Sequence, residues 1–121
     1  MKKSIVTALT AVCLATPAFA ESYPVSGRYG LSTETKPGPI DCTGKRVIRF
    51  AGVQRFDSHG GVPSYRLVDT QRNGATDFRI TEAFATGQIT AQNKIRLQII
   101  DSDRIELVLS PGGTLKLKRC G

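Results

Sequence analysis

An acid, a hydroxyl and an imidazole occur side by side at Asp57, Ser58 and His59, and His59 is the only histidine of the chain. These are the groups of a hydrolase triad, in which nucleophile, base and orienting acid converge from separate elements. Consecutive residues of one loop do not easily form that chain of contacts. Gly60 and Gly61 follow directly and indicate a solvated loop. We therefore predict no catalysis here and treat Asp57, Ser58 and His59 as a candidate binding loop.

The acidic residues give no metal or glycosidase pattern. Asp101 and Asp103 lack the spaced oxygen ligands and final Glu of a calcium loop, and Asp is a common turn residue. Glu82 shares its alternation with apolar Phe78 and Ile80, so we expect it either to pair with an arginine or to lie at the end of a sheet. No phosphate-binding glycine motif, C-x-x-C pair or nucleophile elbow occurs. The sequence predicts no metal, no cofactor and no enzymatic activity.

Basic side chains are a second candidate site. The formal net charge is +7, and removal of Lys2 and Lys3 with an N-terminal signal leaves +5. Arg96, Lys116 and Lys118 occupy alternate positions of neighbouring predicted strands and form a candidate anion patch, although a solvated outer face has the same pattern. The charge favours lipid headgroups, envelope phosphate polymers or an acidic protein surface. Nucleic acid is a poor candidate for an exported protein, and the aromatic interleaving of single-strand grooves is missing.

The first twenty residues predict a cleaved secretory signal. Lys2 and Lys3 precede an apolar stretch from Ile5 to Ala15, and Ala18-Phe19-Ala20 is an A-x-A cleavage site. The apolar stretch is shorter than the roughly 20 residues that span a bilayer, so we predict no transmembrane segment. Residues 1–20 are thus expected to be removed, which leaves residues 21–121 as one domain in the periplasm or outside the cell.

The cysteines predict a crosslink in that domain. Cys13 lies in the signal, and Cys42 and Cys120 remain as an even pair in an oxidising compartment. Two cysteines without supporting histidines make a poor zinc site. We predict a Cys42–Cys120 disulfide that holds the loop 32–45 against the outside or rim of the sheet.

Short runs with a period of two, separated by Gly, Pro, Asp and Asn, predict an all-β domain. The clearest runs are 94–100, 104–109 and 114–119, which we expect to form a three-stranded meander with loops 101–103 and 111–113. That register places Ile99 opposite Ile105 and, in the second hairpin, Leu109 opposite Leu115. All apolar residues of the meander then share one face.

Upstream runs predict further strands at 25–31, 46–51, 65–70 and 77–85, with 86–91 as a continuation or a strand of its own. Two long connections, 32–45 and 54–64, are expected to be loops, and loops of this length are often functional. Seven or eight strands in about 100 residues favour a small antiparallel up-and-down barrel, lipocalin-like, or a compact sandwich.

The run Cys42-Thr43-Gly44-Lys45 before Val47–Phe50, with Cys120 closing the last strand, resembles the C-type lysozyme inhibitors. Those are small periplasmic barrels with a similar early-to-terminal disulfide. The family's Ser-Gly-x-x-Tyr motif is not matched, because Ser26-Gly27-Arg28-Tyr29 has another spacing and precedes the first cysteine. The chain is also similar in size and class to small lipocalin-like metalloprotease inhibitors, but it has no Trp. No site residue is carried over from either family.

The sequence therefore favours an exported binding module without catalysis. Our first hypothesis is an inhibitor of an envelope hydrolase that uses the loops 32–45 and 54–64. The alternative is a binder of an anionic envelope component, or of a small ligand, through the basic face or the barrel interior. The volume inside the barrel discriminates between internal and external ligands.

Overall fold

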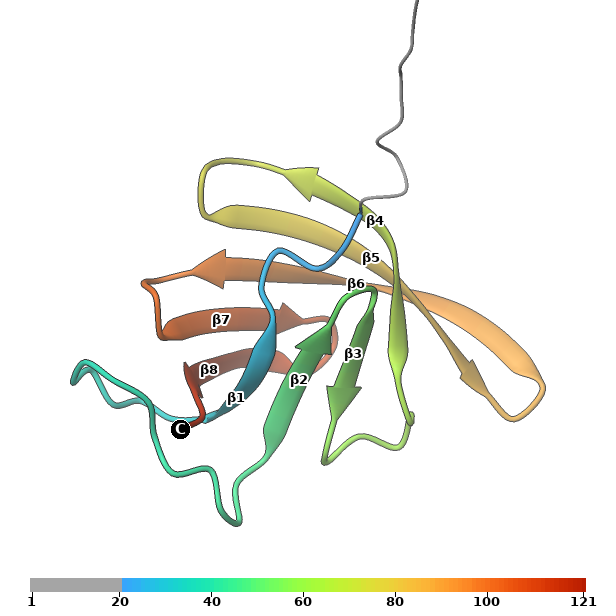
Figure 1. Cartoon of the computed structure of the whole chain (residues 1–121). Coiled ribbons are helices and arrows are strands. Elements are labelled where there is room, and N and C mark those ends of the chain that lie inside the picture. The colour runs from blue at the N-terminus through green and yellow to red at the C-terminus, as the bar shows by residue number, and fades with distance from the viewer. Residues whose placement is uncertain (1–20) are drawn as a thin grey trace, which may run out of the picture.

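The computed structural model describes residues 21–121, which form eight antiparallel strands closed into a barrel (Figure 1). Each strand pairs with the next in sequence, and the last pairs with the first. This confirms the all-β up-and-down barrel and decides against the sandwich. The predicted signal, residues 1–20 with Cys13, lies outside the described residues. The strands are β1 (Gly27–Leu31), β2 (Val47–Ala51), β3 (Gln54–Asp57), β4 (Tyr65–Arg72), β5 (Asp77–Thr86), β6 (Ile89–Ile99), β7 (Arg104–Leu109) and β8 (Gly113–Arg119).

Alternate side chains fill the middle of the barrel. On β2, Ile48 and Phe50 are buried while Arg49 between them is exposed, as expected for a strand with one face on a core. Because the middle is packed, any space for a ligand has to lie at an end or on the outside. The buried apolar cluster comprises Tyr23, Tyr29, Ile48, Phe50, Leu67, Phe78, Ile80, Ile95, Leu97, Ile105, Leu107 and Leu117.

The C-terminal meander is present, with one register corrected. Between β6 and β7, Ile99 lies opposite Ile105 and Ile95 opposite Leu109, as predicted. Between β7 and β8 the predicted register is wrong by two residues, because Leu109 pairs with Gly113 and not with Leu115. The turn is therefore 110–112, one residue earlier than expected. A shift of two keeps the same face inward, so the apolar pattern cannot detect it.

β3 corrects the prediction that 54–64 is one long loop. Gly52 and Val53 form a two-residue turn after β2, and Ala51 pairs with Gln54. Gly52 has φ of +64°, a left-handed conformation that glycine adopts without steric cost. The alternation of β3 is reversed with respect to polarity, since Arg55 is buried at 1% exposure. Only 58–64 remains as the connection to β4.

β5 and β6 form the longest hairpin. Their pairing runs without interruption from Asp77 opposite Gln98 to Thr86 opposite Ile89. The residues 86–91, left open as a continuation or a separate strand, contain the turn and the start of β6. Figure 1 shows this hairpin extending beyond the neighbouring strands. Its inner face at Phe84 and Asn93 forms part of the wall of the site described below.

The predicted disulfide is confirmed. Cys42 and Cys120 are joined with a Cα–Cα distance of 5.6 Å. Tyr29 points into the core, so its neighbour Gly30 faces outward, and Cys42 Sγ would lie 2.6 Å from a Cβ built on Gly30. The crosslink thus lies on the outside of β1 and β8, and Ile40 adds a parallel bridge to Cys120. We refer to residues 32–45, held in this way, as the strap.

Candidate functional site

The interior of the barrel contains a buried ion pair between β3 and β5. Arg55 pairs with Phe50 in the β2–β3 register, so the inward direction of Phe50 is also that of Arg55. Arg55 Nε donates to Glu82 Oε2 at 2.6 Å, and Nη2 donates to Oε1 at 2.8 Å. The two side chains are 1% and 0% exposed. Of the two alternatives that the sequence left open for Glu82, an arginine partner or a place at the end of a sheet, the structure shows the arginine partner.

Two tyrosines complete the surroundings of this pair. Tyr23 Oη donates to Glu82 Oε2 at 2.7 Å. Burial, and then the negative charge of Glu82, raise the pKa of Tyr23 far above its ordinary value, so the phenol stays protonated and acts as a donor. On the other side, the Arg55 guanidinium lies 4.0 Å from the centre of the Tyr65 ring. The guanidinium is thus fixed by a carboxylate at its edge and a ring at its face.

A cavity of about 260 Å³ opens beside Arg55 at one end of the barrel. Two buried polar atoms beside it have no hydrogen-bond partner among the described residues, namely Arg55 Nη1 and Asn93 Oδ1. Each of these atoms is almost fully covered by protein atoms, so the missing partner costs the fold about 1–3 kcal/mol and is not a contact open to the pocket. We call this cavity the barrel-end pocket. It is lined by Arg46, Arg55, Asp57, Gly60, Tyr65, Phe84, Asn93, Leu109, Ser110 and Pro111.

The rim of the barrel-end pocket is ordered by Asp57. Arg46 donates to it twice, from Nε at 3.0 Å and from Nη2 at 2.6 Å, and the backbone N–H of His59 donates to Oδ1 at 3.0 Å. Burial opposes ionisation of Asp57, but the Arg46 and His59 hydrogen bonds outweigh it and hold the pKa of this carboxyl below its ordinary value. Ser58 Oγ accepts from the backbone N–H of Val47 at 2.9 Å, which fixes the start of the loop.

The candidate binding loop therefore lies at the pocket, but its members differ in role. Asp57 lines the barrel-end pocket, whereas Ser58 and His59 lie on the exposed part of the loop. Ser58 Oγ and His59 Nδ1 are 3.2 Å apart, yet the Asp57 carboxylate accepts from the backbone of His59 and from Arg46. The three residues are adjacent, but no hydrogen bond joins the Asp57 carboxylate to the His59 ring, as a triad would require. A binding role for the loop stays a prediction.

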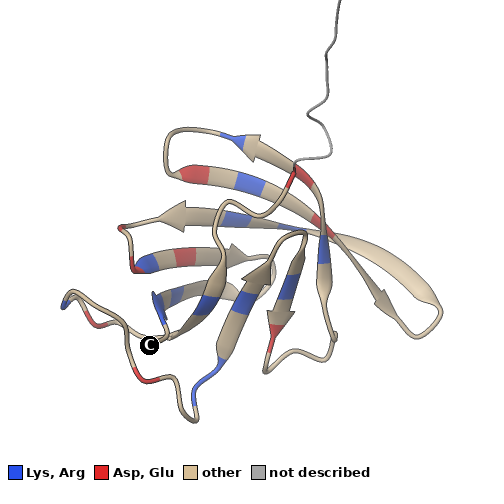
Figure 2. Cartoon of the chain, in the orientation of Figure 1, with Lys and Arg blue, Asp and Glu red and all other residues tan. Residues whose placement is uncertain are grey.

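The candidate anion patch is not assembled as expected, because the β7–β8 register differs from the predicted one. Lys116 lies opposite Glu106 and Lys118 lies opposite Arg104 on β7. Arg96 lies opposite Val108, so the three basic residues are at different levels of the sheet. Arg96 also forms a two-point ion pair with Asp77, at 2.9 and 2.8 Å. Figure 2 shows basic residues spread over the strands with acidic residues among them.

The prediction that Lys118 belongs to an exposed patch is also wrong. Its side chain points outward but is only 1% exposed. The strap covers it. Lys118 Nζ donates to the backbone carbonyl of Lys36 and lies 3.8 Å from Glu34 Oε1. The pattern of β8 predicts a solvated Lys118. It cannot indicate this cover, because the strap is about 80 residues distant in the chain.

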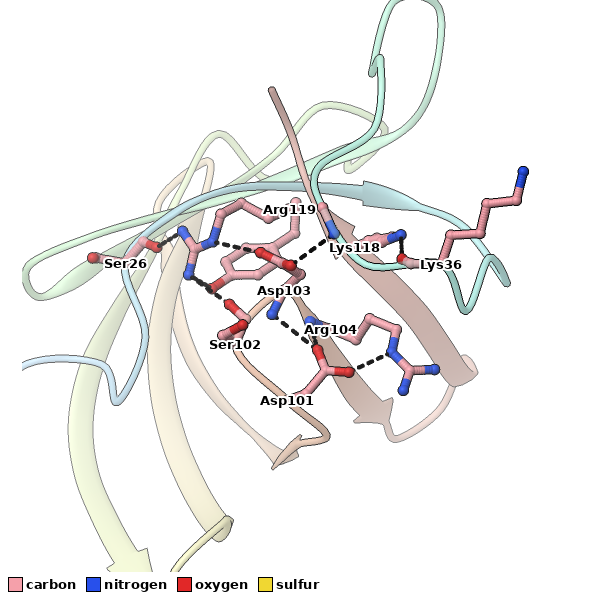
Figure 3. A network of polar contacts seen from close by, with 10 residues as sticks. Ser26, Lys36, Asp101, Ser102, Asp103, Arg104, Lys118 and Arg119 are labelled. Atoms are coloured by element: carbon pink, nitrogen blue, oxygen red, sulfur yellow. Dashed lines mark hydrogen bonds and ion pairs between the residues drawn. The ribbon is translucent and has the colours of Figure 1, made fainter.

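A polar network around Arg119 fixes this side of the barrel (Figure 3). Arg119 donates to Tyr29 Oη at 2.7 Å and to the carbonyl of Ser26 at 3.1 Å. Asp103 Oδ2 accepts from the backbone N–H of Gly38 in the strap at 3.1 Å. Asp101 instead accepts from the backbone of its own turn and from Arg104 Nε at 2.9 Å. The two carboxylates in the turn before β7 therefore hold that turn and the strap, which is a structural role.

A larger cleft of about 410 Å³ lies along β4–β7, lined by outward side chains such as Arg79, Lys94 and Arg96. Its basic groups are partly engaged by neighbours, since Arg96 pairs with Asp77 and Lys94 Nζ donates to Thr81 at 3.2 Å. The barrel-end pocket is smaller, but it lies beside the buried Arg55–Glu82 pair and its rim is ordered by Asp57. We therefore regard the barrel-end pocket as the candidate functional site.

The sequence did not identify Arg55, Tyr65 or Asn93 as site residues. The available signal was Glu82, whose position on an apolar face requires a cationic partner. That partner lies in 54–64, a segment that the sequence predicts to be a loop. In β3 the apolar Phe56 points outward under Arg49, whose guanidinium lies 4.2 Å from the ring centre, so the usual apolar-in pattern fails.

Fold and site together define a small disulfide-bonded β-barrel with a polar pocket at one end. No match to this chain is found among protein-family models, curated proteins or solved structures. Within residues 21–121 there is no cluster of three metal-binding side chains, and no helix has the length and apolar character needed to span a bilayer. The function is therefore argued from the pocket.

Proposed function

We propose that this protein is an exported, non-catalytic binding module whose barrel-end pocket takes a small polar ligand or the protruding end of a larger one. The observation that carries the proposal is a cavity of about 260 Å³ at the barrel end, bordered by the Arg46–Asp57 ion pair and by the apolar side chains of Phe84, Leu109 and Pro111. A concave site with apolar walls and a few fixed polar groups is the usual form of a small-ligand pocket. Because the middle of the barrel is filled by the apolar core, we propose a ligand at the barrel end, in place of the internal ligand and the basic face considered from the sequence.

The absence of catalysis is supported by the state of the ionisable groups. Arg55 is tied to Glu82, and Arg46 is tied to Asp57, each at two points. A general base needs a lone pair or proton that can reach the substrate. Here the four charges hold one another, so they are suited to binding and orientation.

Export is supported by the disulfide, because such bonds persist in oxidising compartments. We expect the protein expressed with its own N-terminus in a Gram-negative host to appear in the periplasmic fraction, starting at Glu21. Fractionation with intact-mass measurement checks this. A full-length cytoplasmic product with free thiols would contradict it.

Binding in the pocket is tested by two-dimensional NMR of the oxidised protein with a set of small organic probes, both charged and uncharged. We expect at least one probe to shift the signals of Tyr65, Asn93 and Arg55 Nε–H. The variant Asn93→Phe, which fills the pocket, should abolish these shifts. Gln92→Phe is the matched control, because Gln92 is exposed on the other face of β6. Pocket signals unmoved by every probe would refute the proposed function.

A second candidate is inhibition of an envelope hydrolase, and the ordered rim favours it. Asp57 and Ser58 fix the loop that borders the pocket, and Asp103 with the disulfide fixes the strap. Preordered loops reduce the entropy lost on association with a protein. Pull-down from a periplasmic extract, followed by hydrolase assays, should retain a partner whose activity falls. No protein retained at micromolar concentration would exclude this candidate.

A further inference from the structure

The outer face of the first four strands carries arginines without acidic partners. Arg28 of β1 lies directly opposite Arg49 of β2, and Arg66 lies near the start of β4. All three side chains are exposed, and none of them makes a hydrogen bond or an ion pair within residues 21–121. By contrast, five arginines elsewhere in the described residues have a carboxylate partner, namely Arg46, Arg55, Arg96, Arg104 and Arg119.

No acidic side chain balances the three arginines on this face. The first carboxylate that follows on β4 is Asp69, beyond the irregularity in the β4–β5 pairing. Figure 2 shows basic bands on β1 and β2 and no acidic band on either strand. Like charges directly opposite each other on paired strands are destabilising, so Arg28 and Arg49 favour an external anion. We call this surface the arginine face; its outward residues are Arg28, Gly30, Val47, Arg49, Ala51, Gln54, Phe56 and Arg66.

Arg49 is held in an orientation that suits an external oxyanion. Its guanidinium lies 4.2 Å from the centre of the Phe56 ring, and the two residues are directly opposite in the β2–β3 register. The ring covers one face of the planar guanidinium, whereas the N–H donors lie in its plane. These donors have no acceptor within residues 21–121, so they are free for an oxygen from outside. Arginine matches phosphate oxygens at two points.

Two exposed valines border the arginine face at the turn between β2 and β3. Val53 in this turn is 43% exposed, and Val68 of β4 is 41% exposed. The backbone N–H of Leu67 donates to the Val53 carbonyl at 2.8 Å, which places Val53 beside the residue before Val68. A soluble anion would leave both valines in water. A lipid surface presents anionic headgroups next to an apolar layer, which suits arginines and valines together.

We infer that the arginine face docks the protein on an anionic lipid surface. The three arginines contact headgroup phosphates, and the two valines enter the boundary below them. Each basic side chain at such a surface strengthens binding about fivefold, and salt screens the attraction. The face shares no residue with the barrel-end pocket or with the candidate anion patch, so the inference is independent of the proposed pocket ligand.

The test is sedimentation of the oxidised protein with lipid vesicles. At low salt, we expect vesicles of phosphatidylglycerol and phosphatidylcholine in equal parts to bind it about a hundredfold more tightly than phosphatidylcholine alone. Salt at about 1 M, where the Debye length is about 3 Å, should remove the difference. Equal binding to both kinds of vesicle, or no binding to the anionic vesicles at low salt, overturns the inference.

Charge variants locate the contact. Arg28→Gln combined with Arg49→Gln should weaken binding to the anionic vesicles about 25-fold. Arg66→Gln should weaken it about fivefold and serves as the test if the first pair fails to fold. Arg79→Gln with Lys94→Gln is the matched control, because it removes the same charge from exposed positions of β5 and β6, on the opposite side of the barrel. A control that weakens binding as much as the face pair would show dependence on net charge alone and overturn the inference.

The valines and a soluble acidic probe complete the test. Val53→Ser combined with Val68→Ser should weaken vesicle binding about tenfold, whereas Ile89→Ser, at the exposed tip of the β5–β6 hairpin, should change it little. Unchanged binding of the valine pair would contradict docking at the lipid boundary. Polyglutamate that binds without any vesicle binding, and is lost in Arg28→Gln with Arg49→Gln, would assign the face to a soluble acidic partner and overturn the lipid assignment.

Discussion

Arg55 and Glu82 show how a small barrel tolerates two charges in its interior. Their two-point contact and the hydroxyl of Tyr23 satisfy most of the polar atoms that burial takes from water. Burial works against the charged guanidinium, yet the hydrogen bonds and charge of Glu82 outweigh it and raise the pKa of Arg55. The pair is stable only while both members are present, because either alone is an uncompensated buried charge.

A double-mutant cycle tests this dependence. Glu82→Leu leaves the Arg55 charge without a partner and should destabilise the protein by about 3–5 kcal/mol. Arg55→Met combined with Glu82→Leu should be more stable than either single variant, because no buried charge remains. Urea unfolding followed by circular dichroism gives the free energies. A double variant less stable than both single variants would contradict this description of the pair.

Tyr23 provides a smaller, separate test. Tyr23→Phe removes a hydroxyl that donates to the charged Glu82 and should cost about 1.5–3 kcal/mol of unfolding free energy. Tyr65→Phe is the control, because the structure gives the Tyr65 hydroxyl no hydrogen bond among the described residues and its ring still supports Arg55. Both are measured by urea unfolding. Equal losses in the two variants would mean that the Tyr23–Glu82 contact adds nothing specific.

At the scale of elements, the loop 58–64 depends on the ionised form of Asp57. The folded pKa of Asp57 is lowered, so the unfolded chain binds more protons between the folded value and the ordinary value of about 3.9. Stability therefore rises with pH in that interval. The contribution is complete above the ordinary value and disappears as pH falls through the folded value.

Asp57→Asn should lower the unfolding free energy by about 1–2 kcal/mol near neutral pH and reduce its decrease in acid. Urea unfolding at several pH values, from about 7 down to about 3, measures both effects. Asp69→Asn is the control, since no side-chain hydrogen bond to Asp69 occurs in residues 21–121. The acid dependence should diminish without vanishing, because the pKa values of Asp77 and Asp101 are also lowered by arginine and backbone contacts. An unchanged dependence in Asp57→Asn would contradict the role of Asp57.

The strap depends on the absence of a side chain at Gly30. A Cβ at this position would lie 2.6 Å from Cys42 Sγ, well inside contact distance. Gly30→Ala should therefore reduce formation of the disulfide and lower stability by about 2–4 kcal/mol. Thiol titration in denaturant, with unfolding of the same samples, measures this. Gly74→Ala is the control, because nothing lies within 4 Å of a Cβ there. Complete oxidation of Gly30→Ala with unchanged stability would contradict the close packing.

These elements also show what could be predicted from the sequence. β2 and the β6–β7 hairpin were predictable because a one-residue slip would turn their apolar rows to water. β3 was not, since Arg55 points inward only because Glu82, 27 residues later, meets it there. The disulfide followed from cysteine counting, but the burial of Lys118 depends on where the strap lies. The pocket residues Arg55 and Asn93 come from strands far apart in the chain, so local pattern could not reveal that they line one cavity.

At the scale of the whole molecule, two devices close the barrel. β8 pairs with β1 through Tyr29–Arg119 to Leu31–Leu117, and the disulfide joins the strap to the residue after β8. The first device is hydrogen bonding over a packed core, and the second is covalent. Both devices join β1 to the C-terminal end of the chain. Reduction breaks only the disulfide, so it separates the contribution of the crosslink from that of the β1–β8 hydrogen bonds.

Reduction of the Cys42–Cys120 bond should lower stability without opening the barrel. The crosslink spans 78 residues, for which the loss of unfolded-state entropy corresponds to about 4.5 kcal/mol. Guanidinium unfolding with and without reductant measures the difference, and Cys42→Ser combined with Cys120→Ser should match the reduced protein. Without denaturant, the NMR signals of Leu97 and Leu107 should stay dispersed, because β1–β8 pairing and the core persist. Signals near Lys118 should change, since the strap that buries it is released. A reduced protein that unfolds without denaturant would show that the crosslink, and not the packed core, keeps the barrel closed.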